Sequence, residues 1–409
     1  MTGQVLVVCD GPVPHARMNY RAEPLVAFLA SRTDYRVDVI CPRPEEAPAA
    51  DPQVRYHHVA PYRRVRSFAD ALGRAADIVR LARVIRRIVA SEPVDCIRSI
   101  STIPTVAALL ARRGRRIPIV ANLSDFYTDL YAASRLPWTS AATALIQRMN
   151  RFAARADAVI VDSDEQRDAW TRAGADPNRC YALPHGIPRT LLLPRAQAKE
   201  ATGEARDRRH RAGGKILYIG DVSRLDGIDV LFHALAMLRR SGFLASCMIV
   251  GQGADAYRKE LEQLTAGLGI AESVTHVPSI LNRELPSLMG EAGVLVAPFR
   301  PSSTTMTALP NKLLEYLSTD RPIVVTSTPT LRRIVGDAVS FVEHEDTESL
   351  AAALRGCLTQ SSMWGGNLDA RQVVRKRLNW SRIIETEISV IAGIVENKPP
   401  DPDHVDFCW

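Results

Sequence analysis

The chain lacks the features that mark membrane, secreted and metal-binding classes of protein. None of its 409 residues falls in an apolar run of about eighteen or more, so we expect no transmembrane helix. The first apolar stretch, Val5–Val8, is too short for the core of a signal peptide. We therefore expect a cytoplasmic protein.

Cysteine and aromatic residues are also few. The seven cysteines include no Cys-x-x-Cys pair, and none stands at metal-ligand spacing from a histidine, so we predict no metal site. Scattered cysteines are typical of small buried side chains in a reducing compartment. Aromatic residues make up 6% of the chain and form no recognised nucleic-acid-binding motif. A non-catalytic nucleic-acid-binding protein is therefore an alternative that charge alone suggests.

Length, composition and charge indicate the number of domains and the kind of partner. A chain of 409 residues with 46% hydrophobic and 24% charged residues suits two globular α/β domains. The formal net charge of +7 favours polyanionic partners, such as a membrane surface or a phosphorylated substrate.

Short β-branched runs alternate with helical periods in the first half of the chain. An early helix is expected over Tyr20–Ser31. The expected strands are Gln4–Cys9, Arg36–Cys41, Cys96–Ile100, Pro118–Asn122 and Ala158–Asp162. Buried strands separated by helices predict a doubly wound parallel sheet.

A polar, charge-dense stretch precedes a second series of the same kind. The expected strands are Lys215–Ile219, Ser246–Val250, Val274–Val277, Gly293–Ala297, Ile323–Thr326 and Val339–Val342, and the expected helices are Asp229–Arg239, Ala256–Leu268, Asn311–Leu317 and Ser349–Leu358. We predict Rossmann-like domains over residues 1–192 and 215–380, joined by a linker over residues 193–214. A final helix and tail, residues 381–409, can cross back to the first domain.

Two such domains facing each other form a cleft, and ligands bind beyond the carboxyl ends of the strands. Gly220 follows the first strand of the second half, with Arg224 in the same loop, and Gly251 follows the second strand. A glycine there lets the backbone approach a phosphate, although a plain left-handed turn is the alternative. The backbone near Val277 and Pro278 can pair with a nucleobase or simply form a tight loop.

The most informative segment is Pro310–Leu317, which follows the Ser/Thr-rich loop Pro298–Leu309. Lys312 and Glu315 stand three apart, so on a helix they share one face. A cation in the first turn is unfavourable unless an anion is present, and a diphosphate would supply one. Glu315 can accept both hydroxyls of a ribose. The alternative is a surface ion pair between the two side chains, which would be worth little.

These segments together resemble glycosyltransferase family 4, a family of retaining enzymes with the GT-B fold. The stretch ADAVIVDSDEQRDAWTRAGADPNRCYALPHGIP resembles its hinge-side segment, and KILYIGDVSRLDGIDVLFHAL its first C-domain strand, loop and helix. MIVGQGADAYRKELEQL resembles its Val-Gly-x-Gly strand, and VTHVPSI its base-binding loop. PNKLLEYLSTDRPIVVTSTP resembles the segment that grips the donor, in a branch with a Pro-x-Lys-x-x-Glu-Tyr motif.

The resemblance implies a role for each of these residues. Glu315 would hold the ribose, while Lys312, Leu313 and the loop Ser302–Leu309 would contact the diphosphate. The backbone at Val277 and Pro278 would hold the base, and Gly11 would lie beside the donor.

The chain departs from the family pattern at three positions. Asp221 and Asp226 stand where the family usually has the Arg and Lys that bind the donor phosphates. Thr307 stands where the family has the first Glu of its E-x7-E pair. Arg224 and Lys312 can supply the missing positive charge, while the donor sugar and the stereochemical outcome stay open.

The implied reaction moves a sugar from a nucleotide-diphosphate sugar to a hydroxyl or amine, with retention and without metal or any cofactor beyond this co-substrate. The acceptor would be a glycan, a lipid-linked glycan or a natural-product intermediate. In the first half, Asp125 and His15 are the candidate catalytic residues, because each lies in a loop that follows a strand. A helix N-cap for Asp125 and a solvated loop position for His15 are the alternatives.

Residues 62–87 are markedly basic, with apolar residues at helical spacing. Such a segment can lie on an anionic membrane, which would place the protein at the inner membrane face. The alternative is an amphipathic helix packed on the sheet.

Two other enzyme classes share a double Rossmann-like fold. An NAD-dependent oxidoreductase needs Gly-x-Gly-x-x-Gly after a strand, which neither half supplies. A nucleotide-sugar epimerase is not excluded by spacing and remains an alternative.

Overall fold

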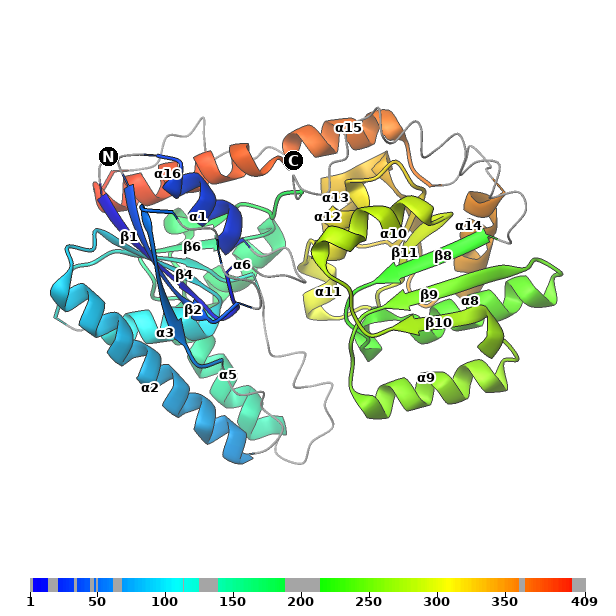
Figure 1. Ribbon diagram of the computed structural model, residues 1–409, viewed down its shortest axis with the longest axis horizontal. Coiled ribbons are helices and arrows are strands. Elements are labelled where there is room, and N and C mark those ends of the chain that lie inside the picture. Colours follow the sequence, from blue (N-terminus) through cyan, green and yellow to red (C-terminus); the bar gives the residue numbers. More distant parts are fainter. Residues whose placement is uncertain are drawn as a thin grey trace. The chain divides into compact units, whose positions relative to one another are not determined.

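The computed structural model describes residues 3–13, 21–32, 35–44, 48, 51–61, 68–112, 114–124, 139–187, 214–359 and 365–398. They fall into two compact units. The first takes in the described residues up to Pro184 together with those from Ser381 onward, and the second spans His185–Trp380. Each unit is a parallel β-sheet with helices (Figure 1).

The first unit is a parallel sheet of seven strands among the described residues, in the order β3-β2-β1-β4-β5-β6-β7. The strands are β1 (Gly3–Cys9), β2 (Tyr35–Pro42), β3 (Val54–Val59), β4 (Cys96–Ile100), β5 (Ile119–Asn122), β6 (Ala158–Val161) and β7 (Cys180–Ala182). The helices are α1 (Ala22–Ala30), α2 (Phe68–Ser91), α3 (Thr102–Ala111), α5 (Thr139–Ala153), α6 (Asp164–Ala173) and α16 (Trp380–Val395). The order reverses at β1, where β2 and β4 flank the strand, as in doubly wound folds.

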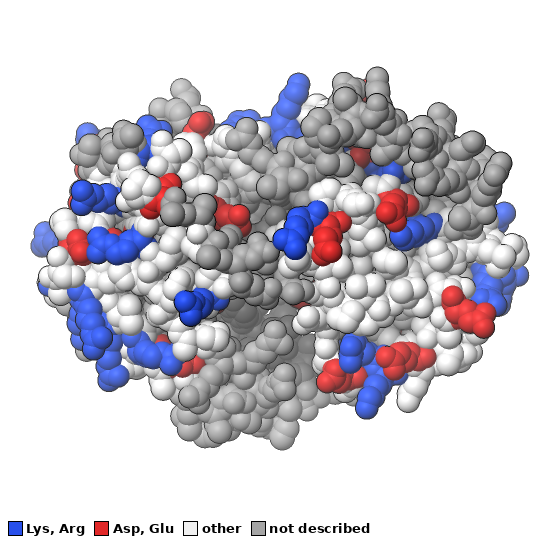
Figure 2. Space-filling view, in the orientation of Figure 1, with Lys and Arg blue, Asp and Glu red and all other residues white. Residues whose placement is uncertain are grey.

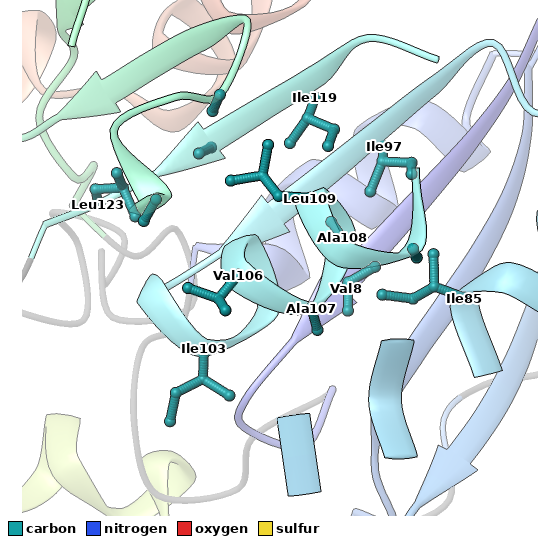
Figure 3. Close-up of a cluster of buried hydrophobic side chains, with 14 of the residues drawn as sticks. Val8, Ile85, Ile97, Ile103, Val106, Ala107, Ala108, Leu109, Ile119 and Leu123 are labelled. Atoms are coloured by element: carbon teal, nitrogen blue, oxygen red, sulfur yellow. The ribbon is translucent and has the colours of Figure 1, made fainter. Parts of the chain in front are cut away.

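One face of this sheet packs against α2, α3 and α5. Figure 3 shows α3 lying over the strands, with Leu109 close to Ile119; Val106 and Ile97 belong to the same buried cluster. All four side chains are buried, and each contributes on the order of 1.5–3 kcal/mol by leaving water.

The helix α16 joins the first unit through its buried face. Ile383, Ile384, Val390, Ile391 and Ile394 follow the helical period and are buried. Glu387 lies on the same face and is fully buried between two arginines. Arg21 Nε donates to Glu387 Oε2 at 2.9 Å, and Arg98 Nε donates to Glu387 Oε1 at 2.6 Å. Two buried guanidinium groups thus share one carboxylate, and Arg21 Nη1 also lies 3.5 Å from Asp162 Oδ1. Burial of these charges is tolerable because each lies against a charge of opposite sign.

The second unit is a parallel sheet of six strands among the described residues, in the order β10-β9-β8-β11-β12-β13. The strands are β8 (Gly214–Ile219), β9 (Ala245–Val250), β10 (Val274–Val277), β11 (Val294–Ala297), β12 (Ile323–Thr326) and β13 (Ser340–Val342). The helices are α8 (Ile228–Arg240), α9 (Asp255–Gly267), α10 (Leu285–Glu291), α11 (Ser303–Thr307), α12 (Asn311–Leu317), α13 (Pro329–Val335), α14 (Thr347–Leu358) and α15 (Leu368–Arg377). Both faces are covered, and the buried side chains divide into one cluster on each face.

The structure corrects the sequence-based prediction in three places. Strands β3 and β7 were not predicted, because β3 has the sequence VRYHHV, without a continuous apolar run, and β7 has only three residues. The predicted loop over Pro298–Leu309 contains the short helix α11, whose N-cap is Ser302. The Ser302 hydroxyl accepts a hydrogen bond from the Thr305 N–H at 3.0 Å.

The expected linker, the cysteines and the expectation about transmembrane helices can be compared only with the described part of the chain. The segment expected to link the domains lies outside it, except for Gly214, which begins β8. Six of the seven cysteines are described, and these six are free and buried. Among the described residues, no helix combines the length and the apolar character that crossing a bilayer requires.

We expect Glu387→Gln to lower the free energy of unfolding by about 3–5 kcal/mol near neutral pH, because it leaves two buried guanidinium groups without their shared counter-charge. Urea denaturation measures the difference. Glu385→Gln is the matched control, since Glu385 is exposed on the same helix, and we expect it to change stability by less than about 0.5 kcal/mol.

The effect should depend on pH in a defined direction. Burial acts to raise the pKa of Glu387, but attraction to Arg98 and Arg21 outweighs it and holds the pKa below the ordinary value of 4.5. A lowered folded-state pKa contributes stability above the unfolded-state pKa, and this stability is lost as the pH falls through the folded-state value. The difference between wild type and Glu387→Gln should therefore shrink below about pH 4.5. A difference that persists unchanged into acid would contradict the ion-pair account.

Candidate functional site

The loops at the carboxyl edge of the second sheet are packed through glycines. Gly220 follows β8 and Gly251 follows β9, with φ angles of 144° and 159°. Their N–H groups donate to Val250 O and Val277 O, each at 2.9 Å, so the strand pairing extends into the loops. A Cβ on Gly251 would stand 1.7 Å from the carbonyl oxygen of Gly220, so the two loops touch backbone to backbone. Only glycine fits this contact.

Lys312, in the first turn of α12, lies directly over the first of these loops. A Cβ on Gly220 would meet Lys312 Nζ at 2.7 Å, so the ammonium rests against the bare backbone. Nζ donates to Tyr218 Oη at 2.6 Å and to Asp226 Oδ1 at 2.5 Å. It also lies over the rings of Tyr218 and Phe299, at 4.5 and 4.8 Å from their centroids. One charge is thus held by a carboxylate, a phenol and two aromatic faces.

The helix α12 is fixed at its C-terminal end and along its length. Tyr316 Oη accepts the Ile219 N–H at 2.8 Å, which ties the helix to the end of β8. Arg375 Nε donates to Leu317 O at 2.5 Å, and Arg371 Nη1 donates to Thr319 O at 3.0 Å. The helix therefore presents its first turn to the Gly220 loop in a defined orientation.

Two buried phenols, Tyr316 on α12 and Tyr218 on β8, stay protonated at neutral pH. Burial raises the pKa of Tyr316 and, together with the neighbouring Asp226 carboxylate, that of Tyr218. The neutral Tyr218 hydroxyl donates to Asp221 O at 2.5 Å while it accepts from Lys312. It can therefore help to position the ammonium without adding a charge.

Glu315 stands one turn after Lys312 and is 7% exposed. The Lys312 side chain is 11% exposed, and its carboxylate partner Asp226 comes from the β8–α8 loop. The alternative of a surface ion pair requires both side chains to lie on the exposed face of the helix, and neither does. A buried carboxylate and a buried ammonium a turn apart can recognise a ligand that carries both hydroxyls and an anion.

The other cations of this edge also have carboxylate partners. Arg224 pairs with Glu260, and its guanidinium lies 4.9 Å from the centroid of the Tyr257 ring. Its side chain is 62% exposed, so it can change partners at low cost. Arg300, which was not predicted as a site residue, pairs with Asp229 at 2.5 Å.

The remaining predicted residues of this unit occupy varied environments. Val277 ends the edge strand β10, and its carbonyl accepts the Gly251 N–H; Pro278 follows it. Thr307 ends α11 and donates to Thr304 O at 3.4 Å. Leu313 lies in the core, and its N–H donates to Pro310 O at 2.9 Å, so it does not line the site.

The first unit has a polar network at the carboxyl ends of β5 and β6. Asn122 Nδ2 donates to Ser124 Oγ at 2.9 Å, and Ser124 Oγ donates to Asp162 Oδ1 at 3.0 Å. Arg21 Nη1 lies 3.5 Å from the same oxygen. Ser163 caps α6 by accepting the Gln166 N–H, and Asp164 lies in the first turn of that helix.

The predicted residues of the first unit are covered only in part. Gly11 is described and is half-buried just after β1, whereas His15 and Asp125 lie outside the described residues. Sequence reasoning missed Tyr218, Phe299 and Asp226 as the surroundings of Lys312. No local signal marked them, because they come from different loops and strands that only the fold brings together.

Two parallel sheets with helices on them, the second with a cation-bearing helix at its carboxyl edge, define the class of the protein. Solved structures with the same fold include sucrose-phosphate synthase from Thermosynechococcus elongatus, with a TM-score of 0.77 at 16% identity over 97% of this chain and 100% of that one. HepE from Anabaena in complex with UDP matches with a TM-score of 0.65 at 14% identity, over 95% of this chain and 100% of that one. The chain has the GT-B fold of these glycosyltransferases.

Family models match both units. Residues 23–191 match the model described as Glycosyltransferase Family 4, and residues 213–360 match the one described as Glycosyl transferases group 1. Each unit thus matches a glycosyltransferase domain model over most of its length.

Curated relatives of the chain are also glycosyltransferases by name. D-inositol 3-phosphate glycosyltransferase from Geodermatophilus obscurus is 29% identical over 59% of this chain and 54% of its own length. D-inositol 3-phosphate glycosyltransferase 1 from Catenulispora acidiphila is 26% identical over 71% of this chain and 70% of its own length. The matched region thus spans about half the length of the first relative and more of the second.

We expect Gly251→Ala to destabilise the second unit by several kcal/mol, because the added methyl group would overlap the backbone carbonyl of Gly220. Thermal unfolding measures this. Gly267→Ala is the control: nothing lies within 4 Å of its Cβ position in the last turn of α9, so it should leave the melting temperature unchanged or raise it slightly. Equal melting temperatures for both variants would mean that the loops do not touch as described.

Proposed function

We propose that the protein transfers a sugar from a nucleotide-diphosphate sugar to a hydroxyl or amine acceptor, and that the second unit binds the donor. The observation that carries this proposal is the buried pair Lys312 and Glu315 on α12, beside the glycine loops at the carboxyl edge of the sheet. The segment that matches the group 1 model contains the pair.

The chemistry follows from where these groups stand. Glu315 accepts hydrogen bonds from the two ribose hydroxyls, while Lys312 contacts the diphosphate and stabilises the charge that develops as the sugar leaves. Arg224, whose side chain is largely exposed, adds a second cation. With cationic side chains serving the leaving group, we propose a reaction without metal and with retention, in which the leaving phosphate accepts the proton of the acceptor.

UDP is the first nucleotide to examine for the donor. The structural neighbour HepE has been solved with UDP and with UDP and glucose. The relatives named above act on D-inositol 3-phosphate, which is therefore the first acceptor to examine. Other acceptors in our proposal are glycans, lipid-linked glycans and natural-product intermediates.

The first unit would bind the acceptor. The network of Asn122, Ser124 and Asp162 supports this, because it gathers hydroxyl-binding groups at the carboxyl edge of the first sheet. Asp125 directly follows Ser124 in the chain, and with His15 it remains our candidate for acceptor-side catalysis.

We expect Glu315→Gln to weaken nucleotide binding by about 1–3 kcal/mol, because an amide replaces a charged acceptor of two ribose hydroxyls. Thermal shift and calorimetry with UDP, GDP, dTDP and ADP measure this. Glu348→Gln, an exposed first-turn position of α14, is the control. Unchanged affinity in a folded Glu315→Gln protein would contradict the placement of the ribose.

We also propose that the first unit touches an anionic membrane through α2, peripherally and from the cytoplasmic side. The apolar residues Ile78, Leu81 and Ile85 are buried in the core of the unit, so they cannot enter lipid. The opposite face carries the exposed arginines Arg80, Arg83, Arg86 and Arg87. Figure 2 shows Lys and Arg side chains along the side where Figure 1 places α2. Attraction would therefore be electrostatic, at about 1 kcal/mol per cation.

Reversing two of these charges should weaken that attraction. We expect the double variant Arg83→Glu and Arg87→Glu to lose at least about tenfold in affinity for vesicles containing phosphatidylglycerol. The control is the double variant Arg239→Glu and Arg240→Glu, which makes the same charge change at the exposed end of α8. Equal binding by both variants in a sedimentation assay would show that α2 is not the contact.

A further inference from the structure

Asp226 forms a largely buried ion pair with the Lys312 ammonium. Its Oδ1 accepts from Lys312 Nζ at 2.5 Å, and its Oδ2 accepts from Ser223 Oγ at 2.6 Å. The two charged side chains are each 11% exposed. The pair is therefore largely shielded from water, where a charge interaction is stronger than at an exposed surface.

The two partners differ in freedom to move. Asp226 has a short side chain that the Ser223 hydroxyl also holds, and the following Gly227 packs against Pro298 O, which fixes the local backbone. Lys312 has a four-carbon stem whose end is held by the Tyr218 hydroxyl and by two aromatic faces. An anion that binds at Gly220 can draw the ammonium toward itself while the carboxylate stays in place.

The presence of Asp226 lowers the attraction of this site for anions. Lys312 alone would present a full positive charge against the bare backbone of Gly220. Together with Asp226 it forms a pair with no net charge, and an incoming phosphate meets both the attraction of the ammonium and the repulsion of the carboxylate.

We propose that Asp226 competes with the donor diphosphate for Lys312 and so sets the affinity and the anion selectivity of the site. This inference rests on the proposed donor site. Asp226 is a specificity-determining residue in this account, because its ion pair with Lys312 lowers the affinity of the site for small anions such as inorganic phosphate. A diphosphate ligand prevails because Glu315 and the glycine loops bind its remaining parts.

The test is Asp226→Asn, which removes the charge and keeps the shape. The Asn oxygen can still accept from Lys312, and the Ser223 hydroxyl can turn to accept from the amide, so the fold should be retained. We expect the affinity for UDP, measured by calorimetry at low salt, to rise about tenfold. Inorganic phosphate should compete with UDP more effectively in the variant than in wild type.

Two further variants isolate the cause. Asp255→Asn makes the same charge change at an exposed position of the same unit, and we expect less than about twofold change in affinity. In a Lys312→Met background, the gain from Asp226→Asn should be clearly smaller than in wild type, because the substitution then removes only the repulsion between carboxylate and phosphate and releases no ammonium.

The possible results distinguish the inference about Asp226 from the proposed function on which it rests. If wild type binds UDP and Asp226→Asn binds it equally or more weakly, Asp226 positions Lys312 instead of competing for it, and the inference is overturned while the proposed function stands. A gain of the same size in the Lys312→Met background also overturns it, because the effect would then not pass through the ammonium. If neither protein binds UDP, GDP, dTDP or ADP, the proposed donor site fails and the inference fails with it.

Discussion

The close approach of the Lys312 ammonium to the backbone of Gly220 is the constraint on which the rest of the site depends. A side chain at Gly220 would occupy the space of the ammonium, and one at Gly251 would strike the Gly220 carbonyl. The glycines therefore let three separate elements, the ends of β8 and β9 and the first turn of α12, meet at one point. Tyr316 then fixes the helix to β8, so that Lys312 and Glu315 occupy defined positions.

Both units bury charge and compensate it within a few ångströms. In the first unit, Glu387 joins α16 to Arg21 and Arg98, and no side chain of this group is exposed. In the second, Lys312 and Asp226 remain slightly exposed at the edge of the sheet. The difference in exposure matches a difference in role. A fully enclosed ion group can stabilise a fold, whereas a pair at a sheet edge can exchange partners with a ligand.

The sequence predicted most of the fold because burial on both faces of a parallel sheet leaves a strong local signal. Cys96–Ile100, Val274–Val277 and Ile323–Thr326 agree residue for residue with β4, β10 and β12, and Asn311–Leu317 agrees with α12. The strands β3 and β7 escaped prediction, because β3 carries polar residues such as His57 and β7 has only three residues. The basic amphipathic segment was predicted as a helix, but only packing showed that its apolar side faces the core.

The sequence by itself determined the alternation of strands and helices, the glycines at the strand ends, and the spacing that puts Lys312 and Glu315 on one helix face. These are local properties, which follow from backbone geometry and periodicity. Only the tertiary structure decided that the partner of Lys312 is Asp226, eighty-six positions away. It also decided that Glu387 lies between Arg21 and Arg98. The strength and the partner of a charge interaction depend on distance and burial, and neither is set until the chain has folded.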